Sequence, residues 1–187
     1  MISLGAGVII VESGKVLLTK RKDLEVWYLP GGRVDEGESL AETAVREARE
    51  ETGLEVEVTR LVGLYSEIGS WSDWHIASFA ARVAGGELRL QVNEVIDMRY
   101  FAPDVLPDDM FWWHRRHILD FFDGVGGSAA WRQEIDVQSG ASSRAELYAL
   151  RDQSELSPAD FYRWYYESNG VGRMKRQDNG RSGGNNV

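Results

Sequence analysis

The sequence contains no cysteine among its 187 residues. A disulfide framework, a thiolate metal site and a thiol nucleophile are therefore excluded, and the absence fits a cytoplasmic location. Basic residues are also in the minority, because 21 Lys and Arg stand against 30 Asp and Glu, which gives a formal net charge of -9. An acidic chain lacks the broad basic surface that neutralises the phosphates of DNA or RNA, so we do not expect long nucleic acid as a partner.

Long apolar runs are missing as well. The apolar opening from Met1 to Ile10 has no basic leader and is too short to span a bilayer, so we interpret it as a buried first strand and expect no membrane partner. A chain of this length with 43% hydrophobic residues can bury one good core and a small appendage. One main domain is therefore the starting expectation.

Turn signals and apolar periodicity divide the chain into short elements. Alternating and β-branched runs predict strands at 4–11, 16–19, 55–64, 76–83, 88–92, 95–101 and 131–137. Helical spacing and capping residues predict helices at 39–52, 110–122, 143–152 and 158–167. From residue 173 the chain is rich in Gly, Asn, Arg and Ser, which predicts disorder. We therefore divide the chain into a main domain (1–123), an extension (124–172) and a disordered tail (173–187).

The helix that follows Ser39 has the clearest signals. Ser39 and Glu42 match a capping box, and Gly53 stands where a helix ends. Its last turns carry three carboxylates within about 100° of one another, those of Glu47, Glu50 and Glu51. Like charges at this spacing repel, and anions near a helix C-terminus oppose its dipole, so we expect something to compensate them.

Two interpretations of this charged face are open. A solvated ladder of ion pairs from Glu42 through Arg46 to Glu50 accounts for the arginine, but it leaves Glu47 and Glu51 unexplained. A hard divalent cation such as Mg2+ prefers oxygen ligands and keeps several waters, and it accounts for all of these carboxylates.

The segment from Gly32 to Leu54 resembles the sequence signature of the Nudix family. Five residues separate Gly32 from Glu38, and seven more precede the run Arg46-Glu47-Ala48-Arg49-Glu50-Glu51-Thr52-Gly53-Leu54. Every fixed position of the pattern G-x5-E-x7-R-E-U-x-E-E-x-G-U is present, where U is a bulky aliphatic residue, and only Ala48 is smaller than usual. The resemblance implies an α/β class fold, the Nudix α/β/α sandwich with a mixed β-sheet, followed by a small, mostly helical C-terminal extension.

The resemblance also implies an activity, that of a Mg2+-dependent pyrophosphohydrolase in which Mn2+ can substitute. Glu47, Glu50 and Glu51 match the family's metal-binding glutamates, and Arg46 would orient one of them. The structural residues of the motif would be Gly32, Glu38 and Gly53. A water activated by Mg2+ would attack the diphosphate bond of a nucleoside triphosphate, or of a nucleoside diphosphate linked to another moiety.

The sequence offers several candidates for the general base and for the substrate contacts. Glu51 and Glu94 are both candidates for the base, although Glu94 could equally be a surface carboxylate, and His75 is a weaker candidate. We assign substrate binding to Arg33, Trp71 and Trp74; the tryptophans lie in a predicted loop at 66–74 and could stack on a nucleobase, with core packing or a dimer contact as the alternatives.

Two further alternatives concern the whole chain. The alternative to an enzyme is a catalytically silent sensor that binds nucleotides. Loss of glutamates from the Nudix signature would have supported this alternative, but all of them are present. The last predicted helix has an apolar stripe that needs a partner. We expect the segment 131–170 either to pack across a homodimer or to cover the cleft.

Overall fold

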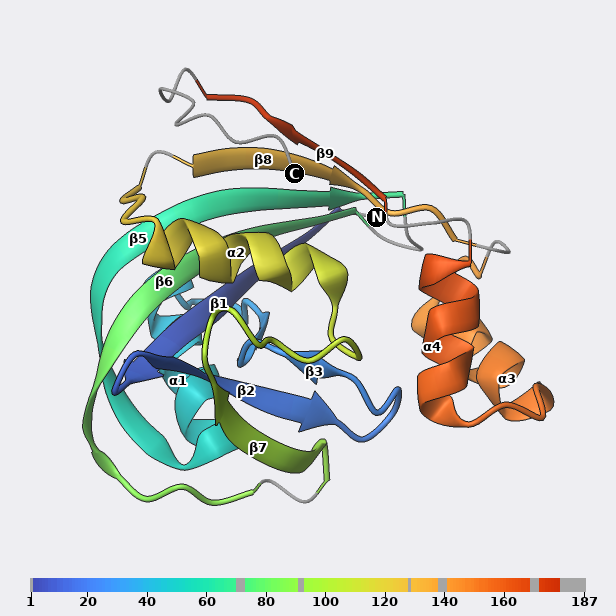
Figure 1. Cartoon of the computed structure of the whole chain (residues 1–187), viewed down its shortest axis with the longest axis horizontal. Helices are drawn as coiled ribbons and strands as arrows, with labels where there is room; N and C mark the ends of the chain where they lie inside the picture. The colour runs from blue at the N-terminus through green and yellow to red at the C-terminus, as the bar shows by residue number, and fades with distance from the viewer. Residues whose placement is uncertain are drawn as a thin grey trace.

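The computed structural model describes residues 2–69, 73–90, 93–127, 129–137, 141–168 and 172–178. Nine strands form a mixed sheet in the order β3-β2-β1-β6-β5-β8-β9, with β4 paired to β1 and β7 paired to β2 (Figure 1). The strands are β1 (Ile2–Glu12), β2 (Lys15–Arg21), β3 (Trp27–Tyr28), β4 (Gly31–Arg33), β5 (Leu54–Ile68), β6 (Asp73–Gly86), β7 (Val95–Phe101), β8 (Ala129–Glu134) and β9 (Arg173–Arg176). The helices are α1 (Leu40–Thr52), α2 (Trp112–Phe122), α3 (Arg144–Gln153) and α4 (Pro158–Glu167).

Strand β1 shows why the sheet needs a helix on each face. Successive side chains of a strand point to opposite faces, and both faces of β1 are apolar. Ile10 packs in one core with Ala44 and Ala48 of α1, whereas Ile9 packs in another with Ile118 of α2. The predicted α/β/α arrangement with a mixed sheet is therefore confirmed.

Helix α1 begins and ends as its capping residues predict. The Ser39 side chain accepts a hydrogen bond from the Glu42 backbone N–H, and the Glu42 carboxylate accepts one from the Ser39 backbone. Gly53 ends the helix in a left-handed conformation with φ of 77°. These local bonds fix which residues of α1 face the sheet.

Two local predictions were wrong. The residues at 66–74 were predicted as a loop, but Ile68 still belongs to β5 and Trp74 already belongs to β6, while Trp71 lies outside the described residues. A strand was predicted at 88–92, yet the described residues of that segment are not in a strand and the side chains of Leu88 and Leu90 are exposed. Alternating leucines there have no apolar layer to pack against, so the pattern misled the prediction.

The segment after α2 adds two strands to the sheet. Strand β8 runs parallel to β5, and β9 pairs with β8 in antiparallel register. The predicted disorder is therefore wrong for Arg173–Arg176, which form β9. Pairing with an edge strand uses backbone groups, so a polar sequence can join it; residues 179–187 lie outside the described residues.

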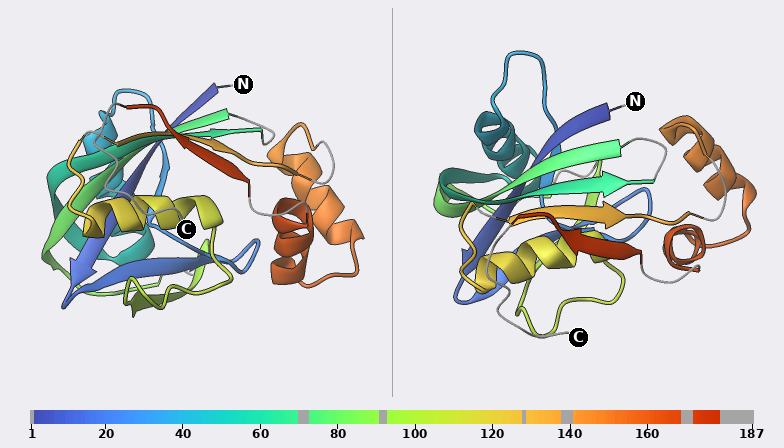
Figure 2. Two further views of the ribbon diagram at one scale, coloured as in Figure 1. Left: turned by 45° about the horizontal axis from the view of Figure 1, so that its top comes forward. Right: turned by 90° about the horizontal axis from the view of Figure 1, so that it is seen from above.

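Helices α3 and α4 lie together at one end of the sheet, beside the connection between β2 and β3 (Figures 1 and 2). Phe161 and Tyr165 of α4 pack in a core with Leu24 and Trp113. The aromatic stripe of α4 thus finds its partner within the same chain. No helix in the described part of the chain is long and apolar enough to cross a membrane.

Candidate active site

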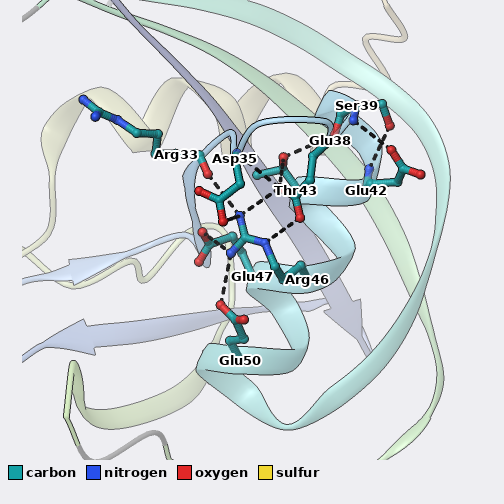
Figure 3. Close-up of polar contacts among 9 residues, drawn as sticks. All are labelled: Arg33, Asp35, Glu38, Ser39, Glu42, Thr43, Arg46, Glu47 and Glu50. Atoms are coloured by element: carbon teal, nitrogen blue, oxygen red, sulfur yellow. Dashed lines mark hydrogen bonds and ion pairs between the residues drawn. The ribbon is translucent and has the colours of Figure 1, made fainter.

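Arg46 joins the loop before α1 to the acidic face of that helix (Figure 3). Its Nε and Nη2 donate to the two carboxylate oxygens of Glu38 at 2.7 and 3.0 Å. Its Nη1 donates to Glu47 at 2.8 Å and to Glu50 at 3.0 Å, and Nη2 also donates to the carbonyl oxygen of Arg33 at 3.1 Å. The hydrogen bonds from Arg46 lower the pKa of Glu38 to about 2. Glu38 thereby holds the guanidinium, and the guanidinium holds Glu47.

Glu51 is the most buried of the three glutamates on α1, with 4% of its surface exposed. The Tyr28 hydroxyl donates to its Oε1 at 2.5 Å, and the Gly31 N–H donates to its Oε2 at 3.2 Å. Burial, together with the negative charge of Glu47, raises the pKa of Glu51 to about 8, although the hydrogen bonds from Tyr28 and Gly31 oppose the shift. A carboxyl with a pKa near neutrality is suited to take up and release a proton.

A cavity of about 1060 Å³ collects most of the predicted site residues. Six of them line it: Gly32, Arg33, Glu47, Glu51, Trp74 and Glu94. Burial raises the pKa of Glu47, and the negative charges of Glu50 and Glu94 add to the effect. Glu94 lies immediately before β7, as predicted, and because its charge acts on Glu47 we call the part of the cavity lined by Glu47, Glu51 and Glu94 its acidic end.

The other predicted residues lie around the cavity or away from it. The Glu50 side chain is 50% exposed and turns toward Arg46 (Figure 3). His75 was the weaker candidate for the base. Its ring contacts the Ser66 hydroxyl at 2.9 Å, and it does not line the cavity. Gly32 is required for close approach, because a Cβ there would lie 2.6 Å from the Cδ of Glu47.

The donor atoms at the acidic end suit a hard cation. Glu47, Glu51 and Glu94 offer carboxylate oxygens, and the raised pKa of Glu47 reflects partial burial and mutual repulsion that positive charge would relieve. Among the described residues, no group of three or more His, Cys, Asp or Glu side chains is arranged to hold a metal ion by itself. These residues still fit Mg2+, because it is commonly held by one or two carboxylates and completes its shell with waters and substrate phosphates.

Several cavity residues were missed from the sequence. Tyr28 was noted only as part of the approach to the motif, and Glu67, His114 and Tyr166 had no assigned role. A signal for Glu67 existed, because it continues the inward alternation of Tyr65 along β5. The predicted strand stopped at residue 64, so that signal was lost.

A comparison with family models matches residues 1–122 to the NUDIX domain. Among curated relatives, a putative 8-oxo-dGTP diphosphatase from Bacillus subtilis is 39% identical over 126 residues, covering 67% of this chain and 83% of that protein. An ADP-ribose pyrophosphatase from Methanocaldococcus jannaschii is 37% identical over 124 residues, covering 64% of this chain and 72% of that protein.

Comparison with solved structures points to the same family. A MutT NUDIX hydrolase from Burkholderia pseudomallei superposes with a TM-score of 0.61 at 29% identity, covering 64% of this chain and 98% of the other. The family model ends at the last residue of α2, so β8, α3, α4 and β9 all follow the residues that it matches.

Proposed function

The chain belongs to the Nudix family of hydrolases, and we propose that it is a Mg2+-dependent pyrophosphohydrolase of small nucleotides. Its substrate would be a nucleoside triphosphate, or a nucleoside diphosphate linked to another moiety. The observation that carries this proposal is the burial of Glu51 beside Glu47 at one end of a cavity of about 1060 Å³, a volume sufficient for a nucleotide.

The names of the relatives support the substrate class. One relative is named for 8-oxo-dGTP and another for ADP-ribose, and both compounds are nucleotides that contain a diphosphate linkage. This chain keeps every fixed position of the Nudix signature, so we propose that it also hydrolyses a diphosphate linkage. The identity of the substrate depends on other residues that line the cavity.

Each residue at the acidic end has a proposed role. Glu47 and Glu51 would hold the divalent cation, with Glu50 as the third predicted ligand. The cation, when bound, supplies positive charge that stabilises the developing charge on the phosphoryl oxygens and lowers the pKa of water. Arg46 keeps Glu47 turned toward the cavity, and Tyr28 stabilises the ionised form of Glu51.

Proton transfer from the attacking water has two candidate acceptors. Glu51 has a pKa of about 8 without the cation, and a cation bound beside it would lower this pKa toward the range of a general base at neutral pH. Glu94 lines the same end of the cavity and is more exposed. Replacing each with glutamine and comparing the pH profiles of kcat/KM would distinguish them, because only loss of the base removes the ascending limb.

On the substrate side, Arg33 and Trp74 form one edge of the cavity. The Arg33 guanidinium lies 5.5 Å from the centre of the Trp74 ring, and it donates to the Ser3 hydroxyl at 3.0 Å. We propose that Arg33 contacts a phosphate and that Trp74 packs against the nucleoside. Trp71, predicted to share this role, lies outside the described residues.

The test is turnover of a substrate panel by the wild-type protein. Nucleoside triphosphates, ADP-ribose, dinucleoside polyphosphates and nucleotide sugars are incubated with Mg2+, with Mn2+ and with EDTA, and the released phosphate and nucleotide are measured. Hydrolysis that requires the cation supports the proposal. Tight binding of a nucleotide without turnover of any compound would instead support the sensor alternative.

A further inference from the structure

A buried glutamate of β5 also lines the cavity, and we call the part that it lines with Trp113, His114 and Tyr166 the inner end. Glu67 of β5 stands directly beside Trp74 of β6 and Gln133 of β8, so the three side chains share one face of the sheet. The Glu67 side chain is only 8% exposed. Its Oε1 is buried and has no hydrogen-bond partner among the described residues. Such a group is costly unless something binds to it.

The residue that faces Glu67 is a neutral histidine. The backbone N–H of Leu29 donates to Nδ1 of His114 at 3.0 Å, so Nε2 carries the proton of the neutral ring. Burial lowers the pKa of His114 to about 3, which keeps the ring neutral. Its Nε2 is 4.0 Å from Oε1 of Glu67, which is too far for a hydrogen bond. Oε1 has no accessible surface in this conformation and no hydrogen bond holds it in place, so the carboxylate, which lines the cavity, is free to turn toward a polar ligand group.

Several aromatic and apolar side chains line the cavity together with Glu67. Trp74 and Ile76 come from β6, Trp113 comes from α2, and Tyr166 comes from α4. The same cavity continues to Glu47 and Glu51 on α1. A flat ring at the inner end would thus be attached to a phosphate chain at the acidic end, which is the shape of a nucleotide. Helix α4 of the extension contributes directly to this inner end.

We propose that Glu67 is a specificity-determining residue that binds the edge of a guanine-type base. This inference rests on the proposed function, because it places the base of the nucleotide substrate. The two oxygens of a carboxylate both accept, so they match an edge with two adjacent donors, which guanine offers at N1–H and its 2-amino group. Adenine and cytosine present a donor beside an acceptor, and that pattern matches an amide better than a carboxylate. Burial raises the pKa of Glu67 to about 8, so the ligand-free carboxyl holds a proton at neutral pH, and two N–H donors would shift it to the ionised form in which both oxygens accept.

The experiment compares dGTP and dATP as competing substrates of the wild-type protein and of Glu67→Gln. The substitution keeps the shape of the side chain but replaces one acceptor with a donor. We expect the ratio of kcat/KM for dGTP to that for dATP to fall by roughly 10- to 100-fold, with kcat for dATP retained. Glu57→Gln is the matched control, because Glu57 is an exposed glutamate of the same strand; its ratio should equal that of the wild type.

Several outcomes would overturn the proposal. An unchanged ratio in Glu67→Gln would show that the carboxylate does not read the base. An equal loss of kcat for both nucleotides would assign Glu67 to the chemistry or to folding, and thermal unfolding of the variant would separate these two.

Failure of the proposed function gives a different result. If the wild type hydrolyses neither nucleotide, equilibrium dialysis with GDP and ADP measures the same preference by binding. Preferential binding of GDP that is lost in Glu67→Gln would support the base contact in a protein without turnover. Absence of any preference would overturn it, whether or not the protein hydrolyses nucleotides.

Discussion

Replacing Arg46 with alanine removes a cation that three glutamates share. The Arg46 side chain is 25% exposed, and the side chains of Glu38 and Glu47 are 21% and 13% exposed. A hydrogen bond to a charged group at such sites contributes about 1.5–3 kcal/mol, and these bonds are not additive. The pair with Glu50, whose side chain is 50% exposed, contributes less than about 1 kcal/mol.

The expected loss in the free energy of unfolding is about 1.5–3 kcal/mol for Arg46→Ala, which comes mainly from the bond to the partly buried Glu47. For a chain of this size, that corresponds to a fall in Tm of roughly 3–12 °C. Arg46→Lys keeps the charge but lacks the planar fork that binds both oxygens of Glu38, so it should recover less than half of the loss. The assay is urea denaturation followed by circular dichroism in EDTA, so that no cation compensates the glutamates.

Arg49→Ala is the matched control on the same helix. Arg49 is exposed, and no ion pair or side-chain hydrogen bond of its guanidinium is found among the described residues. Its replacement removes the same charge and should change the free energy of unfolding by less than about 1 kcal/mol. Equal destabilisation by Arg46→Ala and Arg49→Ala would refute the structural role that we assign to Arg46.

Three further predictions concern the cavity and the extension. Gly32→Ala should lower kcat/KM at least 10-fold with little change in Tm, because the new methyl group displaces only the end of the flexible Glu47 side chain; a loss of Tm without loss of activity would contradict this. Glu67 has a pKa of about 8 in the folded state against an ordinary value of 4.5. Between pH 4.5 and pH 8 the folded state therefore holds a proton that unfolding releases. As pH rises through this window, the group lowers the free energy of unfolding by up to about 1.4 kcal/mol per pH unit. Glu67→Gln should therefore gain stability relative to the wild type from pH 5 to pH 8 in urea titrations, and parallel curves would argue against a buried, shifted carboxyl. Phe161→Ala should cost about 3–5 kcal/mol by the same assay, because Phe161 is fully buried in the core that joins α4 to α2; a loss below about 1 kcal/mol would mean that α4 does not pack there in solution.

Local signals explain why α1 and most of the strands were predictable. Ser39 and Glu42 form a capping box at the start of α1, and Gly53 ends it, so each signal acts on residues close to it in the sequence. The spacing of the carboxylates on α1 was predictable for the same reason. Their different surroundings were not, because the burial of Glu51 depends on Tyr28 and Gly31, which come from a different part of the chain.

Long-range pairing explains what was missed. Glu67 is buried because β8 pairs with β5 beside it, and β8 comes from a segment more than 60 residues later in the chain. Strand β9 was predicted as disorder because it contributes backbone hydrogen bonds and few apolar side chains. The pairing of β9 leaves no mark in local composition or periodicity, whereas the only local signal for Glu67 was an alternation that ran past the predicted end of its strand.

Hydrolysis by Glu51→Gln tests the central claim most directly. The variant keeps the size of the buried side chain but removes the charge that would bind the cation and take up a proton. With the best nucleotide substrate of the wild type, we predict a loss of kcat of roughly 100-fold or more at saturating Mg2+, together with an unchanged or higher Tm. Glu55→Gln, which alters an exposed glutamate outside the cavity, should keep full activity. Wild-type turnover by a correctly folded Glu51→Gln protein would contradict the account, because the glutamates of α1 would then not carry the reaction.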